Sequence, residues 1–326
     1  MSVAQTVLRL GFAVKVLGDG GLPSHDARRW QSEPHLSVSL ERLEAILERL
    51  DRLDVRMYRM ASALAPYATH PDLPRFHAQI EECRAQLARV GARARELDIR
   101  LSFHPGQYVV LNSERDELRA LAAREVDTMA ALLDGLGCGP EAVVVLHVGG
   151  AAGGHAAALE RFERGLSLVG DAGRRRLVIE NDDRTFALPE VLELHRRTGL
   201  AVVWDVLHHH CNDPEDIPDG DALRAALATW PDAVIPKIHY STPKTAIEQR
   251  RERHGRRVEH RYVIPALRAH ADIIDPIAFE RFIRGPAVGL RFDVMLEAKA
   301  KDLALLALRD HLLKRGFGWQ DGRLMP

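Results

Sequence analysis

The stretch Val143-Val-Val-Leu-His147 decides the fold class, because an apolar run typical of a buried strand ends on a histidine. The same pattern, an apolar run closed by His, Asp or Glu, recurs in Leu101-Ser-Phe-His104, Leu177-Val-Ile-Glu180, Ala201-Val-Val-Trp-Asp205, Ile235-Pro-Lys-Ile-His239 and Val294-Met-Leu-Glu297. A parallel barrel produces such a series when its strand ends converge on one site.

Strand-like runs alternate with helical patterns along the whole chain. We predict strands within 7–13, 55–60, 99–103, 142–148, 177–179, 201–204, 234–240 and 289–296. We predict helices within 40–53 (with Ser39 as its N-cap), 73–97, 114–133, 155–168, 188–197, 221–228, 276–283 and 299–314. This alternation implies parallel pairing and right-handed crossovers. We therefore expect an α/β fold, a single (βα)8 TIM-barrel domain over 1–326, with its site at the C-terminal strand ends.

The composition is that of an ordinary globular chain, with 46% hydrophobic and 28% charged residues and a formal net charge of −1. Nothing in this balance indicates nucleic acid, so any basic surface must be local. The three cysteines are scattered and form no CxxC pair, which fits a reducing cytoplasm. The N-terminal residues do not read as a signal peptide, and no apolar run is long enough to span a bilayer. We expect a cytoplasmic protein without a membrane partner.

The residues that close these runs are ones that bind metal ions. Histidine and carboxylate suit Mn²⁺ or Zn²⁺, and a carboxylate can bridge two ions. The candidates are five histidines and three carboxylates. Six of them close the runs, His104, His147, His239, Glu180, Asp205 and Glu297; His208 follows Asp205, and His270 lies beyond a basic stretch. One ion needs fewer ligands, so the set indicates two or three ions. Any one of these histidines alone would more often be a structural residue; their joint placement favours the metal hypothesis.

In two short stretches the spacing of the residues limits which side chains can point toward the site. Lys237 and His239 are two apart on a strand and therefore face the same side of the sheet, although Lys237 alone could equally be a solvated or phosphate-contacting lysine. In the run His208-His209-His210, at least one side chain must point away from the site.

Six motifs in one order resemble the UV damage endonuclease family, a relative of endonuclease IV. They are His104-Pro-Gly-Gln107-Tyr108, Leu146-His147-Val-Gly-Gly150, Ile179-Glu180-Asn-Asp-Asp183, Asp205-Val-Leu-His208-His209, Pro236-Lys237-Ile-His239 and Asp293-Val-Met-Leu-Glu297-Ala-Lys299. The resemblance runs from about Val7 to Lys301. It implies the barrel and a three-metal site.

The resemblance also implies which residues hold each ion. One ion is expected on His104, His147 and Glu180, with Glu180 bridging to a second on Asp205, His239 and Glu297. A third is expected on His208, His270 and Lys237, where Lys237 can be carboxylated so that a carbamate oxygen replaces the ammonium. Manganese is the metal implied, while the ligand types also accept Zn²⁺ or Mg²⁺. Glu180, Lys237, His239 and Glu297 are the expected catalytic residues.

Two further positions bear on the resemblance. Gln107 and Tyr108 are expected to enter the duplex at the lesion, with the ring of Tyr108 replacing lost base stacking. The alternative is that Tyr108 packs at the barrel rim. Phe12 stands where family members often carry a tyrosine, so any polar role at that position is in doubt.

A basic loop at about 243–265 follows the seventh predicted strand. Between Lys244 and Arg261 it carries seven Lys or Arg residues and three Glu residues. It leaves a strand's C-terminal end, so it lies on the catalytic face, and Lys244, Arg250 and Arg257 are candidate contacts to DNA phosphates. A charge run is otherwise usually a solvated face.

The function that the resemblance implies is a metal-dependent endonuclease acting on damaged double-stranded DNA. It is expected to nick on the 5′ side of ultraviolet photoproducts, possibly also of abasic sites, leaving a 3′-hydroxyl and a 5′-phosphate, and to work as a monomer. Two alternatives stay open: a metal-dependent sugar isomerase or epimerase on the same barrel, and a catalytically silent protein that binds damaged DNA. Neither needs all of these motifs together.

Overall fold

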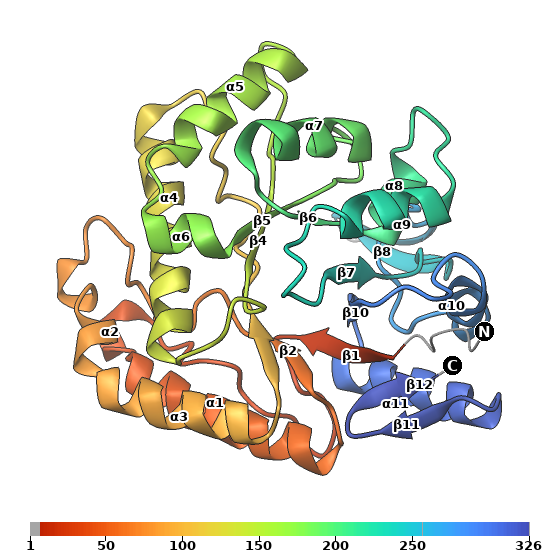
Figure 1. The fold of residues 1–326 in the computed structure, drawn as a ribbon, viewed down its shortest axis with the longest axis horizontal. Helices are drawn as coiled ribbons and strands as arrows, with labels where there is room; N and C mark the ends of the chain where they lie inside the picture. Colours follow the sequence, from red (N-terminus) through yellow and green to blue (C-terminus); the bar gives the residue numbers. More distant parts are fainter. Residues whose placement is uncertain (1–6, 256, 326) are drawn as a thin grey trace.

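The computed structural model describes residues 7–255 and 257–325. Parallel strands occupy the middle of the molecule and helices surround them (Figure 1). The parallel strands are β1 (Leu8–Ala13), β2 (Met57–Arg59), β3 (Arg100–Ser102), β4 (Val144–His147), β5 (Leu177–Glu180), β6 (Val202–Val203), β7 (Lys237–Tyr240) and β10 (Asp293–Leu296). The helices are α1 (Leu36–Arg52), α2 (Gln79–Glu82), α3 (Arg84–Glu96), α4 (Asp116–Gly135), α5 (His155–Leu166), α6 (Asp171–Arg176), α7 (Leu188–Thr198), α8 (Val206–Cys211), α9 (Asp219–Leu227), α10 (Pro276–Arg284) and α11 (Lys301–Lys314).

The parallel strands pair in two groups that follow one another around the molecule. One group has the order β3-β2-β1-β10-β7 and the other has the order β4-β5-β6. Two isolated parallel bridges lie between the groups, Phe103↔Val144 and Asp205↔His239. The prediction of an α/β fold with parallel strands is therefore confirmed, and the sheet is curled.

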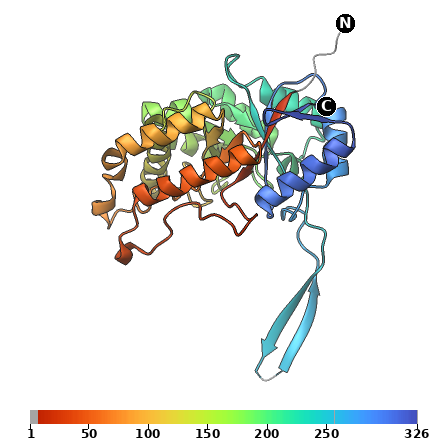
Figure 2. The ribbon, with the colours of Figure 1, turned by 90° about the horizontal axis from the view of Figure 1, so that it is seen from below.

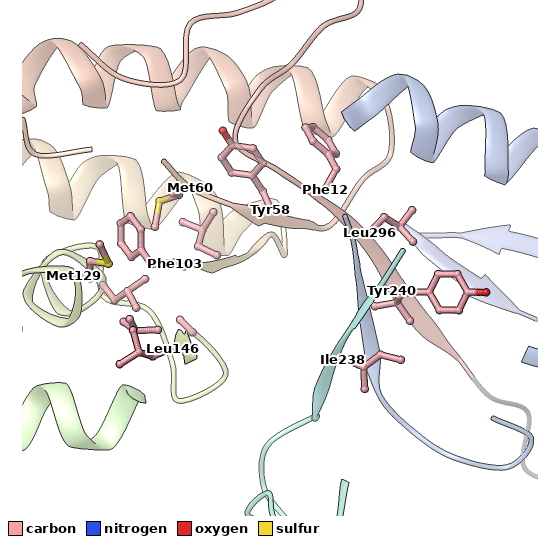
Figure 3. Packing of buried hydrophobic residues seen from close by; sticks show 14 of the residues in the cluster. Phe12, Tyr58, Met60, Phe103, Met129, Leu146, Ile238, Tyr240 and Leu296 are labelled. Carbon is pink, nitrogen blue, oxygen red and sulfur yellow. The ribbon is translucent and has the colours of Figure 1, made fainter. Parts of the chain in front are cut away.

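Alternating residues of each strand face opposite sides of this curled sheet. One face packs apolar side chains against the surrounding helices in the main core, which includes Phe12, Tyr58, Tyr240 and Leu296 (Figure 3). The ring of Phe12 lies edge-on to that of Tyr58, with centroids 5.6 Å apart. Phe12 therefore belongs to the core, on the opposite face of its strand from the residues that point inward.

The inward face carries a small apolar cluster of Ala13, Met57 and Met295, and it also carries the polar residues of the strand ends. Gly11 lies on this face, where a Cβ atom would come 2.8 Å from the carbonyl oxygen of Met57. A side chain at position 11 would thus push β1 and β2 apart.

Two helix predictions need correction. The helix predicted over 73–97 is interrupted: a short 3-10 helix, Pro74–Phe76, is followed by α2 and α3, which meet at Cys83. Proline fits the first turn of a helix and lacks the N–H needed further in, so Pro74 begins a separate turn. Ser39 is not an N-cap, because α1 begins at Leu36; the ring of His35 accepts the Ser37 N–H instead.

The basic segment is not a loop. It forms an antiparallel hairpin of β8 (Glu248–His254) and β9 (Arg257–Val263), which projects far from the body of the molecule (Figure 2). A second hairpin, β11 (Gly318–Gln320) and β12 (Arg323–Met325), extends the sheet beside β1 and was not predicted. Within the described ranges, no helix combines the length and apolar character needed to cross a bilayer.

Candidate metal centre

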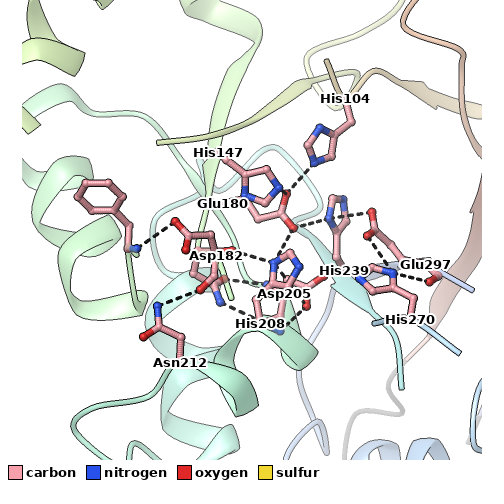
Figure 4. Close-up of polar contacts among 12 residues, drawn as sticks. His104, His147, Glu180, Asp182, Asp205, His208, Asn212, His239, His270 and Glu297 are labelled. Carbon is pink, nitrogen blue, oxygen red and sulfur yellow. Dashed lines mark hydrogen bonds and ion pairs between the residues drawn. The ribbon is translucent and has the colours of Figure 1, made fainter. Parts of the chain in front are cut away.

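The register of the strands brings the polar strand ends to one level. His147 lies opposite Glu180 across β4 and β5, and Asp205 lies opposite His239 in the bridge between β6 and β7. Glu297 follows β10 directly, and Met295 of β10 pairs with His239. Residues far apart in the sequence therefore converge at the C-terminal strand ends (Figure 4).

Glu180 is the centre of this cluster and its side chain is fully buried. One carboxylate oxygen lies 3.0 Å from Nε2 of His104 and 3.7 Å from Nε2 of His147. The other lies 2.9 Å from Nδ1 of His239 and 3.6 Å from Nδ1 of His208. A carboxylate with histidines on both oxygens is suited to bridge two cations.

Three groups of side chains present ligand atoms close enough to share an ion, all within 4.8 Å of one another. They are His104, Glu180 and His239; His147, Glu180 and His208; and Asp205, His239 and Glu297. The last group matches one expected ligand set. The first two share Glu180 but divide the histidines differently from the set implied by the resemblance, because His239 and His208 also reach this carboxylate.

Several buried ligand atoms have no hydrogen-bond partner among the described residues. They include Nδ1 of His147, Oδ2 of Asp205, Nε2 of His239 and Nζ of Lys237. Leaving such an atom unsatisfied costs about 1–3 kcal/mol, and more for a charged group. Their concentration around Glu180 is what a site for cations requires, so the residues fit divalent metal ions.

The pKa values of the buried carboxyl and imidazole groups in this cluster are shifted in different directions. Burial tends to raise the pKa of Glu180, but His239 and His147 hold it well below its usual value. Burial raises the pKa of Asp205. Burial opposes protonation of His208, yet the carboxylates of Asp205 and Glu180 raise its pKa to about 9. Burial lowers the pKa of His104 to about 4. Without cations the cluster balances its carboxylates by protonating histidine.

Lys237 lies one level deeper than His239, opposite Asp293 of β10. Its side chain is fully buried, and burial together with the nearby Arg100 and Arg59 holds its pKa well below the usual value. A neutral amine is the form that can react with carbon dioxide. Among the described residues, no hydrogen bond or ion pair joins Lys237 to His208 or His270, with which the third expected set places it.

His270 reaches the cluster from the returning limb of the basic hairpin. Its Nδ1 lies 2.7 Å from the carbonyl oxygen of Glu297 and 3.7 Å from a carboxylate oxygen of the same residue. Its ring centroid is 6.0 Å from that of His208. Two members of the third expected set therefore face each other.

The three consecutive histidines diverge, as the run predicted. Asp205 caps α8 by accepting the His208 N–H at 2.8 Å, which turns the His208 ring toward Glu180. His209 lies 2.9 Å from the carbonyl oxygen of Ile217, and His210 lies 2.8 Å from Asp219. Only His208 belongs to the cluster.

The sequence analysis missed three residues that support the cluster. Arg59, at the end of β2, forms an ion pair with Glu297. Arg100 forms a buried ion pair with Asp293 at 2.9 Å. Asn181 binds the backbone of Asp205 through both amide atoms. Arg59 and Arg100 could have been found, because each occupies an inward-facing position of an otherwise apolar strand.

The turn after His104 opens onto a cavity of about 260 Å³ that both His104 and Gln107 line. Tyr108 is 87% exposed, so the alternative that it packs at the rim is wrong. Of the three predicted phosphate contacts, Lys244 and Arg250 pair with Glu248, and Arg257 pairs with Glu259 at 3.1 Å.

The fold and site define a class of protein: an α/β protein with a curled parallel sheet and a buried cluster of histidines and carboxylates that could hold metal ions. Residues 35–316 match the family described as UV-endonuclease UvdE. The chain belongs to this family, which confirms the resemblance read from its motifs.

Relatives and solved structures agree. A UV DNA damage endonuclease of Bacillus velezensis is 32% identical over 264 residues, 79% of this chain and 75% of the relative. One from Bacillus mycoides is 30% identical over 83% of this chain and 81% of the relative. The crystal structure of SacUVDE has a TM-score of 0.78 at 28% identity and covers 95% of this chain and 99% of its own. A 3-keto-D-glucoside 4-epimerase from E. coli shares the fold alone, with 10% identity, a TM-score of 0.56 and coverage of 94% and 98%.

Proposed function

We propose that this chain is a metal-dependent DNA repair endonuclease that nicks duplex DNA on the 5′ side of ultraviolet photoproducts. Abasic sites are a second substrate, and the products are a 3′-hydroxyl and a 5′-phosphate. The observation that carries the proposal is the buried carboxylate of Glu180 with four histidines around it, in a chain of the UV-endonuclease family. The relatives' names give the substrate class.

The residues proposed to hold up to three divalent ions, Mn²⁺ in the first place and Zn²⁺ or Mg²⁺ otherwise, are His104, His147, Glu180, Asp205, His208, Lys237, His239, His270 and Glu297. When bound, such ions supply Lewis acidity, which activates water and stabilises charge on a leaving oxygen. We propose that Lys237 is carboxylated, since its amine is buried and has no hydrogen-bond partner among the described residues, and burial lowers its pKa.

Residues of the chain orient the ligand side chains and the DNA. Asn181 fixes the backbone at Asp205, and Arg59 holds the carboxylate of Glu297 toward His239, 3.4 Å away. Gln107 and Tyr108 stand exposed beside the cavity and are proposed to fill the space left in the duplex at the lesion. We propose that together these residues position the phosphodiester 5′ of the lesion against the cluster.

The barrel that carries the site is proposed to be closed. The two isolated bridges, Phe103↔Val144 and Asp205↔His239, support a ring of eight parallel strands. We further propose that the chain acts as one domain and as a monomer.

The test is incision of an end-labelled duplex that carries one defined photoproduct, beside abasic and undamaged duplexes. With Mn²⁺ we expect one cut directly 5′ of the photoproduct, a weaker cut at the abasic site and none in undamaged DNA. A cut 3′ of the lesion, or equal cutting of all three duplexes, would contradict the proposal. Conversion of a ketose by the same preparation would favour the isomerase alternative.

A further inference from the structure

The hairpin of β8 and β9 separates its charges between its two faces. In an antiparallel pair, residues directly opposite each other point to the same side, and successive pairs alternate. One face contains the pairs Gln249↔Tyr262, Arg251↔His260 and Arg253↔Val258. The other contains Glu248↔Val263, Arg250↔Arg261 and Glu252↔Glu259, and it also carries Arg257.

All three acidic residues of the hairpin lie on the second face. There, three arginines are balanced by three glutamates, and Glu248 and Glu259 form ion pairs with Arg250 and Arg257. The first face has two arginines, a histidine and no acid among its described residues. The hairpin is therefore neutral on one side and basic on the other.

The basic face also offers groups that contact bases. Tyr262 is 72% exposed, and Arg251, Arg253, Gln249 and His260 are exposed beside it. Arginine and glutamine bind phosphates and base edges, and an exposed aromatic ring stacks or packs in a groove. This combination is typical of a nucleic-acid contact and has no role in the core, from which the hairpin projects (Figure 2).

The root of the hairpin is fixed to the candidate metal centre. The Lys244 N–H donates to the Ala269 carbonyl at 2.6 Å, and the Ala271 N–H donates to the Thr242 carbonyl at 2.9 Å. Pro243 and His270 form a bridge between these two hydrogen bonds. The hairpin thus begins beside a proposed metal ligand, and its seven-residue strands extend about 20 Å beyond it.

We propose that this hairpin is a DNA-binding ribbon whose basic face, formed by Gln249, Arg251, Arg253, His260 and Tyr262, enters the major groove of the duplex beside the lesion. The major groove is wide enough for a two-stranded ribbon. The inference rests on the proposed function for its substrate. It moves the DNA contact from Arg250 and Arg257, which are paired with acids, to Arg251 and Arg253.

The test compares two double variants that remove the same charge from opposite faces. Arg251→Ala/Arg253→Ala changes the basic face, and Arg250→Ala/Arg261→Ala changes the neutral face. The affinity of the full chain for a fluorescein-labelled duplex is measured by anisotropy at several salt concentrations, in chelator so that no cutting occurs. Each phosphate contact contributes a slope of about 0.9 in log affinity against log salt.

We expect the basic-face variant to bind more weakly and to lose a slope of about 1.8, while the neutral-face variant keeps most of the wild-type slope. Equal losses in the two variants, or a larger loss on the neutral face, would overturn the inference. Thermal unfolding of both variants checks the fold, and Arg251→Gln/Arg253→Gln repeats the comparison with smaller changes. Because binding is measured without cutting, a wild-type protein that binds but never nicks would contradict the proposed function alone.

Discussion

Glu180 shows how a single residue shapes the candidate centre. Placing its carboxylate in the interior is unfavourable, and the histidines on both oxygens offset that by holding its pKa well below the usual value. A carboxylate kept ionised in this way is ready to bridge cations. The surrounding nitrogen and oxygen atoms without hydrogen-bond partners would be unfavourable in an apolar core.

The buried amine of Lys237 is expected to carry a carboxyl group. Burial and the nearby arginines hold the pKa of its amine well below the usual value, which favours the uncharged form that carboxylation requires. Protein labelled with ¹³C-bicarbonate should show a carbamate carbon resonance that is absent in Lys237→Met. A spectrum identical for the two proteins would show that Lys237 stays an amine.

The exposed ring of Tyr108 is expected to act only on damaged DNA. An exposed ring that fills a gap in the duplex contributes only when bases leave the stack, so Tyr108→Ala should slow nicking of photoproduct DNA by about 5–150-fold, as expected from a loss of about 1–3 kcal/mol of stacking. Metal content should not change. Tyr108→Phe, which keeps the ring, is the matched control and should retain most activity; a Phe variant as slow as the Ala variant would speak against stacking.

At the scale of elements, the loop before α1 is tied to the helix by Asp26. Its buried carboxylate accepts hydrogen bonds from Arg28 and from the His35 N–H at 3.0 Å, while Ser39 accepts the Asp26 N–H at 2.9 Å. These contacts replace the Ser39 cap that the sequence predicted. They also hold the pKa of Asp26 well below its usual value.

The hydrogen bonds of the Asp26 carboxylate make the free energy of unfolding depend on pH. Because the folded-state pKa lies below the unfolded value, the stabilisation is present above about pH 4 and is lost as the pH falls toward the folded pKa. Asp26→Asn should therefore lower the free energy of unfolding by about 1.5–3 kcal/mol at pH 7, and less at pH 3. Urea unfolding of both proteins at the two pH values measures this; a difference that is the same at both would contradict it.

The sequence predicted the strands and missed details that depend on tertiary contacts. Period-two and apolar patterns found every parallel strand, because each is buried on its helix side. The helix over 73–97 was wrong, since the buried Gln79 side chain binds the Pro66 and Phe76 carbonyls across a break that periodicity does not reveal. The hairpin at 248–263 was missed because its strands are exposed and lack the apolar alternation that signals a buried sheet.

Most residues of the candidate site could be predicted from the sequence, because each of them ends an apolar run. His270 closes no apolar run; it was a candidate beyond the basic stretch, and the resemblance implied its place in a ligand set. Arg59 and Asn181 were missed, because their roles come from contacts with Glu297 and Asp205, which follow other strands. The division of histidines among ions likewise depends on side-chain geometry, which spacing does not fix.

At the scale of the whole molecule, a compact body carries the cluster and a separate arm carries basic charge (Figure 2). This arm is the hairpin of β8 and β9, whose strands pair only with each other among the described strands. Replacing 248–263 by two glycines should therefore change the melting temperature by less than about 2 °C, since the core loses no contact. DNA affinity should fall. A large loss of stability, measured by calorimetry, would show that the arm packs against the body.

We propose that the cluster around Glu180 makes the chain a metal-dependent nuclease. Nicking of a single-photoproduct duplex is measured with chelator-stripped protein, with the same protein after Mn²⁺ is restored, and with Glu180→Gln and His147→Ala treated alike. We expect a cut 5′ of the lesion only in the Mn²⁺-restored wild type. We also expect less bound manganese in both variants, with activity reduced by at least the roughly 10–100-fold that the loss of an outer-shell partner costs. Undiminished nicking by stripped protein, or by a folded Glu180→Gln variant, would contradict this proposal.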